Sequence, residues 1–298
     1  MPWLGLSVVW GFSFVFIKVC ASYLDPFQTT FGRLSLGALV LLAVLAVQRR
    51  KPVTDWRGIK HLAFIALLAQ ALPFTLFAFA EHHISSVAAG LVNSTMSLWT
   101  GLLAIVLLPE ERLDRTRGAG LTMGFIGILI LLGVWDANFQ GNWVAYVSCS
   151  LATIGYAVSA LWTRKYIAPL GYNPTSAVAT QLTLATTMQG LAVLLYSSAP
   201  THWPADGVIS LALLGALGTG VALVLNFRII ELAGAVTAST VTYSIPIVST
   251  IAGAVLLREA VHWYEPVGAA IILVGIALVQ GYLPRARRHS LAMQPTAD

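Results

Sequence analysis

The chain has 298 residues, of which 57% are hydrophobic and only 10% are charged, and its mean hydropathy is +0.80. Because soluble domains carry about 25% charged residues, this composition excludes an ordinary soluble domain. The net charge of +5 is not evidence for nucleic-acid binding, because the cations lie between long apolar runs, as they do in membrane proteins. We therefore expect a lipid bilayer as partner and no nucleic acid.

Apolar runs of about 20 residues match the hydrocarbon thickness of a bilayer. Ten such runs, separated by short stretches with turn-forming residues, predict an all-α membrane protein with ten transmembrane helices at residues 3–21, 27–48, 58–80, 84–108, 117–135, 141–163, 174–197, 206–230, 234–257 and 264–283. The polar tail at residues 284–298 is expected to be disordered and cytoplasmic. The first run lacks a basic leader and a cleavage site, so we interpret it as a retained helix.

The second half of the sequence repeats the first with a constant shift of 148 positions. The matching pairs include Pro26 and Pro174, Leu34 and Leu182, Phe79 and Phe227, Glu111 and Glu259, Gly120 and Gly268, and Gly127 and Gly275. The predicted units are residues 1–135 and 136–283, with five helices each, so the second unit is upside down in the membrane. Inverted repeats are typical of carriers that expose a central site to each side in turn.

The positive charges segregate across the ten predicted spans. One side receives 14 of the 17 Lys and Arg residues, whereas Lys18 and Arg258 lie on the other side and Arg33 lies within a span. Since loops rich in Lys and Arg face the cytoplasm, we expect both termini to be cytoplasmic.

Several short motifs, in a fixed order and duplicated, resemble the EamA type of the drug/metabolite transporter superfamily. They are Trp10-Gly11, Pro26, Phe31-Gly32-Arg33, Ser86 to Leu91, Glu110-Glu111-Arg112-Leu113, Gly118, Gly120, Gly234 to Ala238, Pro246, Arg258-Glu259 and Gly268. The resemblance extends over nearly the whole chain, and the amino-acid exporters called YddG-like are the most similar kind. It implies ten helices in two inverted halves, a bacterial inner membrane, and export of amino acids or related metabolites. One departure is Ser97, which occupies the region where the family often has a proline, and this leaves a kink in the fourth helix open.

The candidate site consists of aromatic and polar residues that fall within helices. Trp and Tyr in membrane proteins usually lie near helix ends, and buried amides need a partner or a wet cavity. Bundle packing is the competing explanation for each residue alone, but the repeat brings equivalent helices to one midplane site. The predicted substrate-binding residues are Trp10, Phe14, Arg33, Gln70, Asn93, Trp99, Tyr156, Trp162, Thr242 and Tyr243.

Charged residues near helix ends have structural interpretations. Arg33 either anchors a carboxylate or ties down loop carbonyls, and Lys18 is expected to extend toward the membrane surface. Glu111 and Glu259 are expected to cap the helices that follow them. The adjacent His82 and His83 do not share a helix face, so no metal site is predicted.

The function predicted from the sequence is export of a small molecule by alternating access, driven by the substrate's own gradient. The predicted spans contain no Asp or Glu in mid-span, where proton-coupled carriers typically have one, and the sequence contains no nucleotide-binding loop. Efflux of lipophilic cations is the first alternative, and a membrane sensor or enzyme is the second. No catalytic residue and no cofactor are predicted, and the chain is expected to be a monomer or a weak homodimer.

Overall fold

The computed structural model describes residues 2–107, 115–200, 202–226, 228–229, 232 and 241–280. Throughout this part of the chain the regular structure is helical. The first half contains α1 (Pro2–Cys20), α2 (Pro26–Val47), α3 (Trp56–Ala66), η1 (Leu67–Ala71), α4 (Leu72–Glu81), α5 (Ser86–Asn93), α6 (Met96–Leu107) and α7 (Arg115–Leu132). The second half contains α8 (Ala137–Trp162), η2 (Thr163–Ile167), η3 (Ala168–Leu170), α9 (Pro174–Tyr196), α10 (Ala205–Ala212), η4 (Leu213–Val221), α12 (Val241–Leu256) and α13 (Tyr264–Gln280).

These elements account for the ten predicted spans and confirm the all-α membrane fold. Seven helical segments are long and apolar enough to cross a bilayer, and three shorter apolar helices lie at Gly118–Leu132, Val241–Leu256 and Tyr264–Val279. The third span is continuous from α3 through η1 to α4, whereas the fourth is divided between α5 and α6. The start of the predicted helix 234–257 and the tail 284–298 lie outside the described residues.

The second helix of each half begins in the same way, at residues separated by the shift of 148. Asp25 precedes Pro26 and accepts hydrogen bonds from the backbone N–H groups of Phe27 and Gln28. Asn173 precedes Pro174 and accepts from Ser176. A short polar residue followed by proline at the first helical position satisfies free N–H groups and presets the helical φ. The repeated motif therefore encodes a repeated helix start.

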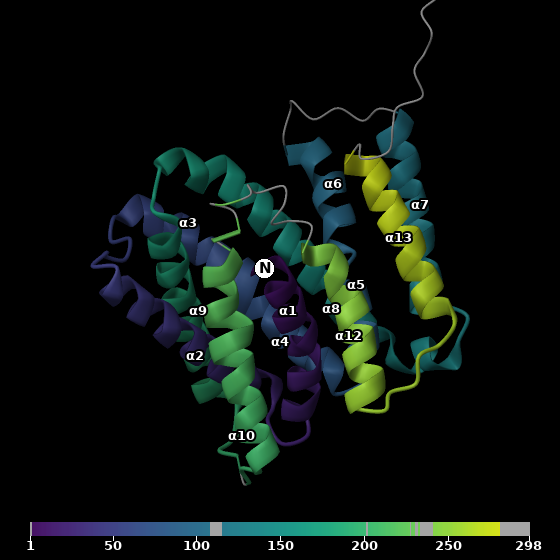
Figure 1. The fold of residues 1–298 in the computed structure, drawn as a ribbon, viewed down its shortest axis with the longest axis horizontal. Coiled ribbons are helices and arrows are strands. Elements are labelled where there is room, and N and C mark those ends of the chain that lie inside the picture. The colour runs from purple at the N-terminus through teal and green to yellow at the C-terminus, as the bar shows by residue number, and fades with distance from the viewer. Residues whose placement is uncertain are drawn as a thin grey trace, which may run out of the picture.

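The main helix contacts join one half to the other. In Figure 1, α7 and α13 lie side by side at the edge of the bundle, and α1 lies beside α12 in its centre. A Cβ atom added to Gly120 of α7 would lie 2.7 Å from the carbonyl oxygen of Gly275 on α13. A Cβ atom added to Gly275 would lie 2.7 Å from the carbonyl oxygen of Gly120. These glycines therefore let the two backbones meet directly, as small residues do between membrane helices.

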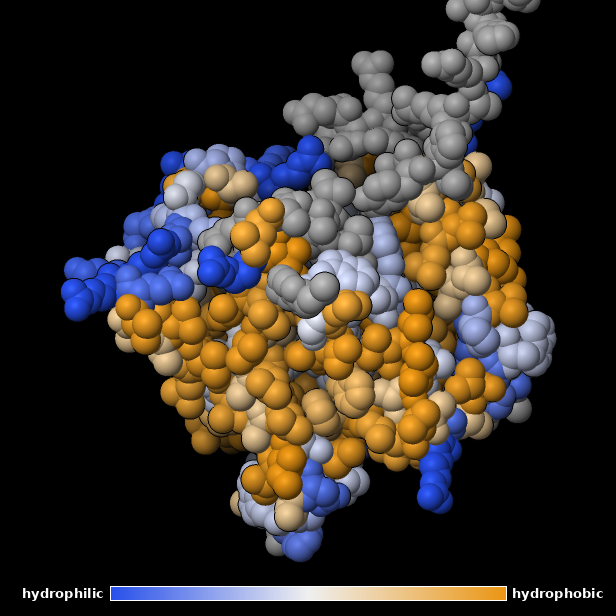
Figure 2. Space-filling model, viewed as in Figure 1, coloured by the Kyte–Doolittle hydropathy of each residue, from blue (hydrophilic) through white to orange (hydrophobic). Residues whose placement is uncertain are grey.

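The surface has the pattern of a membrane protein. Figure 2 shows an apolar band across the molecule, with hydrophilic residues gathered beyond its edges. Leu39, Leu194 and Ile251 contribute to the exposed apolar surface. The end of the bundle at which α1 begins, with Pro2, is called the N-terminal end. The opposite end contains the turn between α1 and α2 and is called the Asp25 end, after a residue of that turn. Exposed cations gather at the N-terminal end, among them Arg49, Arg50, Lys51, Arg57, Lys60, Arg164 and Lys165.

Candidate functional site: a central polar cavity

Two helices are widened at positions related by the shift, and both widened turns face the centre of the bundle. The turns η1 and η4 are π-helical, so their hydrogen bonds skip one residue more than in an α-helix. Pro73 follows η1 and lacks the N–H that a regular ladder needs. Glycines at 215, 218 and 220 make η4 easy to distort. Such turns often occur at functional sites, and here they place Gln70 and Thr219 toward one cavity.

The fourth span is interrupted in mid-membrane without a proline. The helix α5 ends at Asn93, a turn follows at Ser94 and Thr95, and α6 begins at Met96. Thr95 packs its hydroxyl oxygen 3.2 Å from that of Thr153 on α8, which supplies a polar partner at the break. The sequence did not decide whether the fourth helix is kinked near Ser97. In the structure the helix is interrupted at Ser94 and Thr95, just before that residue. The break leaves Asn93 at a helix end, on the wall of the cavity.

The widened turns and the break surround a cavity of about 270 Å³. Seven of the ten predicted residues line it, namely Trp10, Phe14, Arg33, Gln70, Asn93, Tyr156 and Thr242. The other lining residues were not among the predicted site residues; they are Ser13, Ile17, Ala69, Phe74, Phe77, Met96, Gly218, Thr219, Leu223 and Ile245. Both halves contribute, and none of these described residues is an Asp or Glu. The cavity thus combines apolar walls with a few polar groups, which is typical of a small-molecule site.

Arg33 is the one charged residue among those that line this cavity. Its Nε donates a 2.9 Å hydrogen bond to Oγ1 of Thr219 on η4, and its guanidinium carbon lies 3.7 Å from the ring centre of Phe74. The Arg33 side chain is 8% exposed, and within the described residues Thr219 is its only hydrogen-bond partner. The terminal nitrogens of this buried cation therefore remain available to a ligand. Guanidinium binds carboxylate in a two-pronged manner, which fits this arrangement.

A second hydrogen bond is almost the repeat image of the first. The shift of 148 takes Arg33 to Gln181, and Nε2 of Gln181 donates a 2.7 Å bond to Oε1 of Gln70 on η1. In both cases the second helix of one half bonds the widened turn of the other half. The second pair is neutral and Gln181 does not line the cavity, so the positive charge is contributed by the first half alone.

Aromatic rings close the cavity toward the Asp25 end. Phe14 and Phe77 meet edge to face with ring centres 5.7 Å apart, and Phe77 stacks on Tyr156 at 6.2 Å. Ile84 and Val87 belong to the same buried cluster as these phenylalanines. This end is therefore sealed by well-packed apolar side chains.

Three of the predicted site residues lie outside the cavity lining. Trp99 packs edge to face on Phe125, with ring centres 5.2 Å apart. Trp162 donates a 3.3 Å bond to Nδ1 of His61 and packs on Phe64. Tyr243 packs against the buried cluster around Phe14. Adjacent positions on a helix point in different directions, so Tyr243 and its neighbour Thr242 have different surroundings.

The charged residues near the Asp25 end hold elements together. Lys18 does not extend toward the membrane surface as predicted, because its ammonium donates to the carbonyl oxygens of Glu81 at 2.6 Å and Ile84 at 2.8 Å. The expectation for Glu259 named the wrong helix, since its carboxylate caps α5 in the other half. It accepts bonds from the Ser86 N–H at 2.9 Å, the Ser86 hydroxyl at 2.8 Å and the Val87 N–H at 3.1 Å. Glu111 lies outside the described residues.

One buried acid was not predicted, because the predicted third helix ends at residue 80. In the structure α4 continues to Glu81, whose side chain is fully buried and whose carboxylate oxygens have no hydrogen-bond partner among the described residues. Glu81 is not part of the cavity lining.

Comparisons with known proteins agree with this architecture. The model of the EamA-like transporter family matches residues 3–133 and again residues 143–280. An uncharacterized transporter of Archaeoglobus fulgidus is 23% identical over 93% of this chain and 96% of its own length. The uncharacterized transporter YoaV of Bacillus subtilis is 22% identical, with coverage of 92% and 93%. A protein of known crystal structure shares the fold with a TM-score of 0.67 at 21% identity, and the match covers 95% of this chain and 98% of that one. The chain is therefore a multi-pass membrane protein that belongs to the EamA-like transporter family, a family of transporters and not of enzymes.

Proposed function

We propose that this protein exports amino acids or related small metabolites that carry a carboxylate, and that it does so by alternating access. The observation that carries the proposal is Arg33, a cation with unused donors in a cavity that no described Asp or Glu lines. A buried charge needs a counter-charge, and a carboxylate of the substrate supplies it. The aromatic walls then receive the apolar part of the molecule.

The packing of the helices supports alternating access by two equivalent halves. The contact of α1 with α12 becomes, under the shift, the contact of α8 with the α5–α6 span, and both are present. Likewise, the contact of α2 with η4 corresponds to that of α9 with η1, and both are present. Contacts that exchange in this way allow one half to rock against the other around a fixed site.

The lipophilic-cation alternative has one observation in its favour, which is the number of aromatic rings on the cavity wall. Rings such as Trp10 and Tyr156 bind cations through their faces. Arg33 acts against this alternative, because a like charge in the same cavity repels a cationic substrate. We therefore place carboxylates ahead of cations.

The driving force in this proposal is the outward gradient of the substrate itself. Counterflow in proteoliposomes, with the pH gradient collapsed by an ionophore, tests both the substrate class and the energetics. We expect exchange of labelled phenylalanine or 3-phenylpropionate and none of tetraphenylphosphonium. Exchange of the phosphonium alone would contradict the carboxylate proposal, and accumulation that requires an imposed pH gradient would contradict the proposed driving force.

We also propose that the protein lies in a bacterial inner membrane with its N-terminal end in the cytoplasm. The exposed cations at that end, including Arg49, Arg50 and Lys51, support this orientation. With two inverted halves both termini are cytoplasmic. A phosphatase fused after Asp298 should therefore be inactive in intact cells and a fluorescent protein fused there should fold. The opposite pattern contradicts the topology.

A further inference from the structure

The Asp25 end contains a titratable group that the proposed transport cycle does not use. Glu81 is the last residue of α4, its side chain has no exposed surface, and within the described part of the chain neither carboxylate oxygen has a hydrogen-bond donor. The nearby Glu259 differs, since three donors satisfy its carboxylate. An ionised carboxylate without donors is far more costly to bury than a neutral carboxylic acid. The packing around Glu81 therefore favours the acid with its proton bound.

We propose that Glu81 is a proton-binding site that fills when the Asp25 end closes and empties when it opens. On closure the carboxylate takes one proton from water at that end and becomes a neutral acid. On opening, water reaches the side chain and the proton returns to the same side. Because the proton enters and leaves on one side, the site controls the closed population without adding energy to transport.

The groups around Glu81 are consistent with this role. The ammonium of Lys18 on α1 is bound to the backbone carbonyls of Glu81 and Ile84, and not to the Glu81 carboxylate. The charged groups within electrostatic range of Glu81 are Arg33 on α2, Lys18, and Glu259 in the segment between α12 and α13. The buried thiols of Cys20 on α1 and Cys149 on α8 also lie within electrostatic range of Glu81. No donor from these elements reaches the carboxylate itself.

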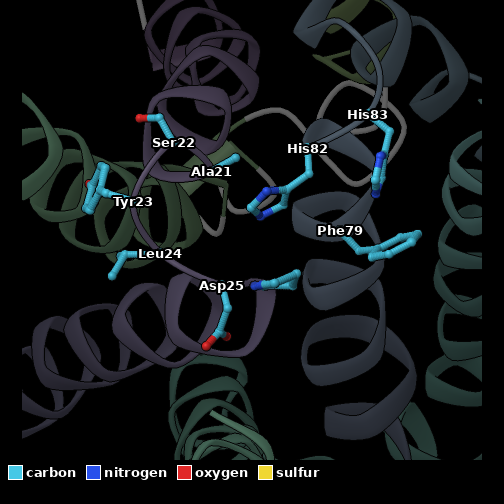
Figure 3. Close-up of a pocket in the computed structure, with 9 residues that line it drawn as sticks. Ala21, Ser22, Tyr23, Leu24, Asp25, Phe79, His82 and His83 are labelled. Carbon is cyan, nitrogen blue, oxygen red and sulfur yellow. The ribbon is translucent and has the colours of Figure 1, made fainter. Parts of the chain in front are cut away.

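A groove on the surface of the Asp25 end provides the approach for water. It has a volume of about 420 Å³ and lies between the turn that joins α1 to α2 and the end of α4. Figure 3 shows His82 extending toward this turn, while His83 lies beside Phe79, with ring centres 5.1 Å apart. Phe79 lies two residues before Glu81 and His82 directly follows it, so movement of this segment away from the turn would open a path from the groove to the acid.

Cys20 offers a natural reporter for opening, because its side chain is fully buried at the same end. In a Cys149→Ala background, we would measure the rate at which a charged methanethiosulfonate labels Cys20 between pH 5 and 8, in the wild type and in Glu81→Gln. Taking the ratio of the two rates at each pH removes the thiol's own pH dependence. The ratio of wild type to variant should be near one at the acid end and then rise, by at most about tenfold per pH unit, because closure binds one proton.

Three variants separate Glu81 from other groups and from misfolding. Glu81→Asp retains an acid and should keep a pH-dependent ratio with a shifted midpoint. Asp206→Asn removes an exposed acid of the same end and should behave as the wild type. Burial and the neighbouring His83 lower the pKa of His82, so replacing both histidines by Gln tests whether they are responsible. A constant ratio across the pH range, or a pH response that disappears with the histidines, overturns the proposal. Counterflow of phenylalanine is measured in a separate experiment. If phenylalanine is not exchanged, that result contradicts the proposed substrate but not the proposed role of Glu81.

Discussion

Replacing Arg33 with Gln should weaken carboxylate binding by about tenfold to a hundredfold, because hydrogen bonds to a charged group contribute about 1.5–3 kcal/mol. Arg33 lies in the cavity wall, where Nε donates to Thr219 and the other guanidinium nitrogens have no hydrogen-bond partner among the described residues. The variant keeps an amide and loses the charge and the fork of donors. The measurement is the half-saturating concentration of 3-phenylpropionate in counterflow.

Two further variants define what the loss means. Arg33→Lys restores the charge without the planar fork, so it should recover part of the affinity. Arg57→Gln removes an exposed cation at the N-terminal end and should leave affinity unchanged. If all three variants bind the carboxylate equally well, Arg33 is a structural residue that only ties α2 to η4.

The fold was predictable because the bilayer imposes long apolar segments and the repeat confirms where they lie. Span length and composition placed α2 and α9 to within one residue at each end, aided by the proline at their starts. The division of the fourth span was not predictable, because the turn at Ser94 and Thr95 contains no proline or glycine, the residues that usually mark the end of a helix. The widened turns η1 and η4 also have no periodic signal, since their apolar pattern continues through them.

The site residues were predicted well where the depth of a side chain in the membrane determines its surroundings. They were predicted poorly where the direction in which the side chain points determines them. Gln70 and Asn93 were identified because a mid-span amide cannot face lipid. Tyr243 lies at the same depth as its neighbour Thr242, which lines the cavity, but Tyr243 packs against the buried cluster around Phe14, and only the direction of the side chain distinguishes the two. Trp162 is instead the last residue of α8, where it donates to His61. Glu81 was missed for a different reason, since a boundary error of one residue moved it from a helix into a loop.

Contacts between the two halves could not be predicted, because a sequence motif does not show which helix its side chains will contact. Glu259 was expected to cap the helix after it, as charged residues before a helix often do. Instead Glu265 closes that turn locally, where it accepts a 2.8 Å bond from the His262 N–H. This leaves Glu259 to reach the start of α5.

Replacing Glu259 with Ala should open the Asp25 end at every pH. The variant removes three hydrogen bonds that join the segment after α12 to the first turn of α5, one of them from the Ser86 hydroxyl. Cys20 should then be labelled about tenfold to a hundredfold faster than in the wild type, since bonds to a carboxylate contribute about 1.5–3 kcal/mol.

The matched control is Glu265→Ala, which removes a carboxylate at the same end that accepts its hydrogen bond from the His262 N–H within its own turn. It should lower the melting temperature without exposing Cys20, because the contact that it breaks does not join the two halves. The response to pH distinguishes the role of Glu259 from that of Glu81. Loss of Glu259 raises the rate of Cys20 labelling at every pH, and the rate still depends on pH. Loss of the Glu81 acid instead removes this pH dependence. If Glu265→Ala exposes Cys20 as much as Glu259→Ala does, general loosening of this end explains both, and Glu259 is not a specific link between the halves.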